Sequence, residues 1–134
     1  MNAVVNPVLS IPDFESGNID PEYFDHEAHV YVGCLYVQEY PLTEALGNFD
    51  AALRRLVVKV GADGKYHATL TWFFLLLIAE RIQNPEPWQV FKQRNPDLLE
   101  GSKKLLSRYY SQDVLFSDRA RERFVLPNNV AVNK

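Results

Sequence analysis

The sequence contains one cysteine, Cys34, among its 134 residues. A single cysteine cannot form an intramolecular disulfide, which excludes the small secreted folds that are held together by disulfide bridges. The first residues carry no basic stretch followed by a long apolar one, so they do not have the pattern of a secretory signal. We therefore expect a cytoplasmic protein in which Cys34 is an inert residue of the core.

Long apolar runs are also missing. The most apolar run extends from Leu70 to Ala79 and is interrupted by Thr71, whereas a membrane span needs roughly 20 apolar residues. Basic residues do not dominate either, because the net charge is −3; this disfavours a general nucleic-acid-binding surface. Phosphate-binding loops, dinucleotide fingerprints and Gly-x-Ser-x-Gly elbows do not occur. We expect no membrane and no nucleic-acid partner.

What the chain does have is the composition of one globular domain. Hydrophobic residues make up 47% of the sequence, enough to bury a core over this length. Apolar residues recur with helical spacing, which predicts an all-α fold, a compact bundle of four to six helices over residues 20–127. Residues 1–19, which contain Pro7, Pro12 and Gly17, are expected to form an extended N-terminal arm. Residues 128–134 are expected to form a loose tail.

Capping signals set the bounds of three long helices. Asp25 is placed to cap a helix that ends near Tyr40. A second helix is expected over residues 43–60, and a third over 65–82 that is apolar nearly all round and therefore central to the core. Gly33 costs about 1 kcal/mol in mid-helix relative to alanine, which indicates a close helix approach or a ligand there. Shorter helices are predicted at 88–93, from Pro96 to about 109, and at 118–123.

The chain has only three histidines, and all of them fall at predicted helix starts. His26 and His29 open the first long helix, and His67 opens the third. Short connections make neighbouring helices antiparallel, so the first and third helices should run parallel with both starts at one end of the bundle. Three imidazoles would then meet in a histidine-lined pocket, which could serve as a metal site or as an acid–base site.

A metal centre is one interpretation of these histidines. His26 and His29 are about one helical turn apart, so both can face one ion, and His67 would complete a set of three nitrogens with a position open for water. The cofactor would then be a divalent transition metal such as zinc, iron or manganese. His-x-x-His is a weak pattern by itself, so this interpretation depends on all three histidines converging.

A metal-free site is the second interpretation. A histidine would act as general acid or base, Tyr66 or Tyr110 would be its catalytic partner, and Lys65 or Arg108 would bind a small-molecule ligand carrying negative charge. This arrangement requires the helix after Pro96 to run antiparallel to the third helix, which would bring its end to the histidines. Whether the protein is an enzyme does not follow from these residues.

The third interpretation makes the histidines structural. Histidines at helix starts often bond only to backbone groups or to a neighbouring carboxylate. The protein would then be a non-catalytic interaction or oligomerisation module, for instance a homodimer. Aromatic residues outside the core would form its contact patch: Tyr31, Tyr40, Trp88, Phe91 and Phe116.

Several segments carry a resemblance. The most distinctive is Lys65-Tyr66-His67-x-Thr69-x-Thr71. The others are His26-x-x-His29, Leu35-Tyr36, Glu44-Ala45, Arg108-Tyr109-Tyr110-Ser111 and Arg121-x-x-Phe124-Val125-Leu126-Pro127. Together, over residues 22–127, they resemble a family of small, uncharacterised bacterial helical proteins. The resemblance implies a compact bacterial domain, and it implies no reaction, because no activity is established for that family.

Overall fold

The computed structural model describes residues 9–20, 22 and 24–129. Within these residues the chain forms eight α-helices and no strand, which confirms the predicted all-α fold. The helix count exceeds the predicted four to six because short helices replace an expected extended arm at one end of the chain and an expected single helix at the other. No helix of the described residues is both long and apolar enough to cross a membrane.

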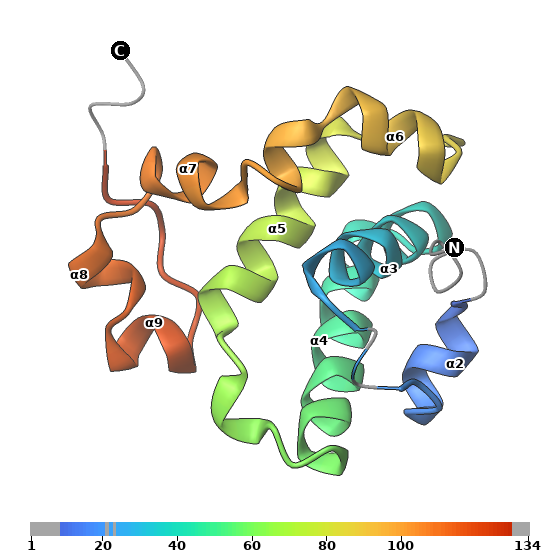
Figure 1. Cartoon of the computed structure of the whole chain (residues 1–134), viewed down its shortest axis with the longest axis horizontal. Coiled ribbons are helices and arrows are strands. Elements are labelled where there is room, and N and C mark those ends of the chain that lie inside the picture. Colours follow the sequence, from blue (N-terminus) through green and yellow to red (C-terminus); the bar gives the residue numbers. More distant parts are fainter. Residues whose placement is uncertain (1–8, 21, 23, 130–134) are drawn as a thin grey trace.

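Three long helices form the centre of the molecule: α3 (His26–Glu39), α4 (Leu42–Lys59) and α5 (Ala68–Arg81). Each of the three packs against the other two. In Figure 1, α4 and α5 diverge from α3 and are joined at their far ends by a short 3-10 helix, η3 (Asp63–Lys65). Figure 1 shows the end of α4 and the start of α5 apart from each other, bridged by the segment that contains η3.

Helix α3 begins and ends where the sequence predicts. The Asp25 carboxylate accepts a hydrogen bond from the Ala28 amide at 3.0 Å and caps the first turn. Tyr40 is extended, as expected for a residue that precedes proline. A Cβ atom on Gly33 would lie 2.9 Å from Cδ1 of Ile78 on α5, so the predicted close helix approach is confirmed.

The bounds of α4 and α5 differ slightly from the prediction. Helix α4 begins at Leu42, directly after a proline, so Thr43 lies inside the helix and does not cap it. It ends before Gly61, whose φ of 74° is the left-handed conformation that glycine adopts without strain. Helix α5 begins later than expected, because η3 intervenes and His67 takes the capping position.

The expected extended arm over residues 1–19 contains a helix in its described part. Helix α2 (Ile11–Ser16) is capped by Ser10 and ends at Gly17, whose φ is 75°. Phe14 is fully buried, and its ring stacks on Phe49 of α4 with centroids 5.3 Å apart. Six residues are too few to show a helical period in the sequence, whereas tertiary packing of one aromatic residue stabilises the helix. Residues 1–8 lie outside the described residues.

The C-terminal part consists of short elements. They are α6 (Trp88–Arg94), η4 (Pro96–Leu98), α7 (Ser102–Ser107), α8 (Gln112–Leu115) and α9 (Asp118–Glu122). The single helix expected after Pro96 is broken near Gly101, where a Cβ atom would lie 3.1 Å from the Asp97 backbone. The amides of Asn128 and Asn129 donate to the Tyr109 carbonyl at 3.1 Å, so these two residues of the expected loose tail are anchored; 130–134 lie outside the described residues.

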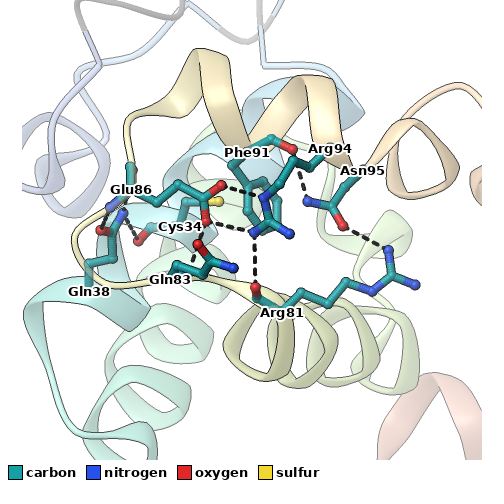
Figure 2. Close-up of polar contacts among 8 residues, drawn as sticks. All are labelled: Cys34, Gln38, Arg81, Gln83, Glu86, Phe91, Arg94 and Asn95. Atoms are coloured by element: carbon teal, nitrogen blue, oxygen red, sulfur yellow. Dashed lines mark hydrogen bonds and ion pairs between the residues drawn. The ribbon is translucent and has the colours of Figure 1, made fainter.

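A buried carboxylate fastens the connection between α5 and α6 to α3 (Figure 2). Glu86 accepts two hydrogen bonds from the Arg94 guanidinium, both 2.8 Å long, and a third from the Gln83 amide. Its own amide donates to the Gln38 side chain on α3 at 2.8 Å. The hydrogen bonds from Arg94 hold the pKa of Glu86 below its usual range. Because its oxygens already have partners, this cluster is structural.

Candidate functional site

A pocket of about 510 Å³ lies between α3, α4 and α5. Its walls are mainly apolar, and its polar groups come from the starts of α3 and α5 and from the end of η3. Its apolar lining is Phe24, Val30, Phe49, Leu53, Leu56, Val57, Val60, Ala62, Leu70, Phe74, Leu75 and Ile78. Its polar lining is Asp25, His26, His29, Lys65, Tyr66, His67 and Thr71. All three histidines therefore line one pocket, as their positions in the sequence predict.

His67 has a hydrogen-bonding partner for each ring nitrogen. Its Nδ1 accepts from the Leu70 amide at 3.2 Å, which caps α5. Its Nε2 donates to the Leu115 carbonyl at 2.7 Å. Burial lowers the pKa of His67, in keeping with a neutral ring that carries its proton on Nε2. No lone pair of this imidazole is left for a metal or for a substrate.

His26 has one ring nitrogen engaged. Its Nε2 donates to the Leu98 carbonyl at 2.8 Å, which connects the start of α3 to η4. The edge of its ring meets Phe74 on α5, with centroids 4.9 Å apart. These contacts fix the orientation of His26 against the pocket wall.

His29 differs from the other two histidines because neither ring nitrogen has a hydrogen-bonding partner among the described residues. Its ring packs on Phe24 with centroids 4.3 Å apart. Its pKa is lowered to about 4, mainly by burial and also by the neighbouring His26, while Asp25 acts in the opposite direction. The imidazole is therefore neutral at pH 7 and offers one donor and one acceptor to the pocket.

The described residues include no group of three or more His, Cys, Asp or Glu side chains that could hold a metal ion. The histidines share a pocket, but His67 uses both nitrogens and His26 uses one for backbone carbonyls or amides. The geometry gives no support to the three-histidine metal centre, which stays a prediction.

Lys65 and Tyr66 also line the pocket. The Tyr66 hydroxyl donates to the Asp50 carboxylate, and the Arg54 guanidinium lies 4.2 Å from the centre of its ring. Burial, together with the bond to Asp50, raises the pKa of Tyr66, which makes this hydroxyl a poor acid. Lys65 is exposed, and it has no ion pair with any side chain that the structure describes, a set that does not include the side chain of Asp63.

The structure does not bring Arg108 and Tyr110 to the pocket. Tyr110 is buried in the C-terminal part, where its hydroxyl donates to the Val125 carbonyl at 2.6 Å, and burial raises its pKa to about 12. Arg108 is exposed at the end of α7. Both were expected near the histidines on the basis of a long helix after Pro96. That helix is broken, so its end does not reach the starts of α3 and α5.

Of the five aromatic residues expected to form a contact patch, Tyr31, Tyr40 and Trp88 are half-buried and pack against other aromatic rings. Tyr31 meets Trp88 edge-on with centroids 5.3 Å apart, and Trp88 stacks on Phe91, which is buried. Tyr40 packs on a core tyrosine, Tyr36. Phe116 is 65% exposed, so one residue of the expected patch is freely accessible. A homodimer stays a prediction.

The sequence alone did not reveal the apolar wall that α4 supplies. Val57 and Val60 belong to the apolar face predicted for this helix, which we expected to be core. Both are only half-buried, because they border the pocket. A cavity leaves no mark on the pattern of apolar residues, so no signal in the sequence separates a pocket wall from a packed core.

Comparisons of the chain with protein-family models, with curated proteins and with solved structures gave no match. Neither a family nor a relative therefore assigns a role to the residues of the pocket. The resemblance to small bacterial helical proteins stays a prediction. The geometry of the pocket and the chemistry of His29 and Lys65 are the features that bear on function.

Proposed function

We propose that this protein binds a small, mainly apolar molecule in the pocket between α3, α4 and α5. The observation that carries the proposal is the pocket itself, about 510 Å³ with apolar walls and an unpartnered His29 imidazole among the described residues. This volume lies within the range of about 300–1,000 Å³ that is typical of small-molecule sites. Such sites combine apolar walls with a few polar groups that orient the ligand.

The apolar walls supply the driving force. The lining includes side chains of α4 such as Leu53 and Val57 and side chains of α5 such as Leu70. Each Å² of apolar surface that ligand and wall remove from water contributes about 25 cal/mol. Part of this gain is lost to the entropy of association, so affinity follows from the fit of the ligand and not from area alone.

His29 supplies the orienting contact. Its neutral ring can donate one hydrogen bond and accept another, whereas His67 and Tyr66 already have their partners inside the protein. No described side chain of the pocket pairs a nucleophile with a base: Cys34 is buried outside the lining, and burial raises the pKa of its thiol. These features support a binding role for the pocket over a catalytic one.

A matched pair of valines tests the proposal. Val57 lines the pocket, and its neighbour Val58 is 65% exposed on the same helix. We expect 1-octanol to shift the ¹³C-methyl NMR signals of Leu53 and Leu70 in a saturable way, and Val57→Phe to weaken this binding at least tenfold by filling the pocket. Val58→Phe should leave it unchanged. Shifts that do not saturate, or that both variants affect alike, would contradict the proposal.

A further inference from the structure

We infer that the ligand of this pocket is an apolar molecule ending in one carboxylate, with the carboxylate paired to Lys65 and hydrogen-bonded by His29. This inference rests on the proposed binding function and names the ligand class. It follows from the charges around the pocket, from the electrostatics of the start of α5, and from the unpartnered imidazole.

The charged groups of the pocket favour an anion. Among the described residues, the charged side chains that line it are Asp25 and Lys65. The Asp25 carboxylate is engaged at the start of α3, where it accepts the Ala28 amide and offsets the positive end of that helix. Lys65 has no ion pair with any side chain that the structure describes, and the side chain of Asp63 is outside that set. Of the two described charges, Lys65 is therefore the one that no described group offsets.

The start of α5 strengthens this positive field. Its cap is the neutral His67, and its first turn contains no acidic residue, so no carboxylate of that turn balances the partial positive charge of the helix end. Arg121 donates to the Gly64 carbonyl beside it and lowers the pKa of His67 by its charge. Lys65 precedes this helix start by three residues. A carboxylate beside Lys65 would therefore be attracted both by the lysine charge and by the partial positive charge of the helix start.

The described acidic groups at the pocket already have partners, which disfavours a cationic ligand. Asp25 accepts the Ala28 amide at the start of α3, and the two oxygens of Asp50 are taken by the Tyr66 hydroxyl and by the Arg54 guanidinium. The apolar lining also limits the ligand to one charge, because a second charged group would lie against side chains such as Leu53 and Phe74 with no partner. Burying an unpaired charge costs several kcal/mol.

His29 gives the carboxylate a second contact. A neutral imidazole donates one N–H, and a carboxylate is an acceptor with two oxygens, so one oxygen can face His29 while the other faces Lys65. A primary alcohol of the same chain length would keep a hydrogen bond to His29 but lose the charge pair. The two ligands therefore separate the contribution of Lys65 from that of the apolar walls.

The test compares octanoate, 1-octanol and octylamine, which share one apolar chain, by NMR titration at pH 7.5. We expect octanoate to bind about tenfold more tightly than 1-octanol, and octylamine to bind most weakly. Lys65→Gln should lower the affinity for octanoate to that for 1-octanol, and it should leave the affinity for 1-octanol unchanged. Lys103→Gln, at an exposed lysine outside the pocket lining, is the matched control and should change neither the affinity for octanoate nor that for 1-octanol.

His29→Phe keeps an aromatic ring against Phe24 but removes both ring nitrogens. It should therefore weaken the binding of octanoate and of 1-octanol by the same factor. Equal affinities for octanoate and 1-octanol, or tightest binding of octylamine, would overturn the carboxylate inference while leaving the binding function intact. A Lys65→Gln variant that binds octanoate as the wild type does would overturn it too. If neither octanoate nor 1-octanol binds, the proposed function itself fails, and the inference fails with it.

Discussion

His67 and Leu115 join the start of α5 to the C-terminal part of the chain: Nε2 of His67 donates to the Leu115 carbonyl at 2.7 Å. The same ring accepts the Leu70 amide on its other nitrogen. One imidazole thus caps a helix and holds α8 in place. Its hydrogen bonds point to a structural role, although its position in the sequence also suggested a metal ligand.

We expect His67→Ala to destabilise the fold. The variant loses a helix cap, which costs about 1 kcal/mol, and leaves the Leu115 carbonyl without its donor, which costs about 1–3 kcal/mol more. Urea unfolding measures the sum. His67→Asn restores a capping acceptor for α5 but cannot reach α8, so it should recover only the smaller part. Wild-type stability in His67→Ala would contradict the structural role.

The two engaged nitrogens of His67 also bear on metal binding. An ion held by His26, His29 and His67 together would have to break the bonds to Leu70 or Leu115. We therefore expect that any uptake of zinc, iron or manganese, measured by plasma mass spectrometry on tag-free protein, does not change in His67→Asn. Stoichiometric metal that disappears in this variant would restore the three-histidine centre.

His29 predicts a pH dependence of stability. Its pKa falls from the ordinary histidine value of 6.5 to about 4 in the folded protein, so the unfolded chain binds a proton that the native ring does not. Stability is then full above pH 6.5 and declines as the pH falls from 6.5 towards about 4. A shift of this size corresponds to a loss on the order of 3 kcal/mol.

Urea unfolding of the wild type and His29→Phe between pH 7.5 and pH 4 measures this effect. As the pH falls, the free energy of unfolding of the wild type should decrease relative to that of His29→Phe, so that any advantage of the wild type becomes smaller or is reversed. Asp25 and His26, the titratable groups that interact with His29, remain in both proteins, so their own titration largely cancels. Parallel pH profiles would show that His29 titrates normally in the native state.

Two helical glycines should respond differently to alanine. A Cβ atom on Gly33 would lie 2.9 Å from Ile78 Cδ1 and 3.1 Å from Leu75 Cδ1, whereas nothing lies within 4 Å of one on Gly47. Gly47→Ala should stabilise the protein by about 0.5–1 kcal/mol. Gly33→Ala should be less stable than Gly47→Ala by about 1–3 kcal/mol, because overpacking offsets the gain in helix propensity. Thermal unfolding compares the two; an equal gain in both would show that α3 and α5 separate easily.

The helices that carry the pocket could be predicted because their signals are local. Asp25 caps α3, Gly61 ends α4, and the placement of all three histidines at one end follows from short connections between helices. The part that failed depends on contacts between distant residues. Gly101 rests on the Asp97 backbone, and the resulting break keeps Tyr110 away from the histidines. A glycine at position 101 is a signal for an interruption, but the apolar period continues past it, so the sequence pattern does not show that the helix stops there.

The roles of the histidines could be predicted less well than their positions. The sequence places His26, His29 and His67 in equivalent settings, yet the carbonyls of Leu98 and Leu115 engage two of them and leave the third without a partner among the described residues. Those carbonyls lie 72 and 48 residues away along the chain. No pattern of side chains reports where a distant backbone oxygen will lie.

Phe49 of α4 connects the pocket to α2. Its side chain is part of the pocket lining, and the ring of Phe14 on α2 stacks on its ring. Helix α2 therefore supports a residue of the pocket wall, although α2 itself contributes no residue to the lining. Shortened versions of this chain that begin after Gly17 would lose that support, and they would behave as binding mutants with every contact residue still present. A chain that includes α2 is thus the appropriate starting material for ligand screening.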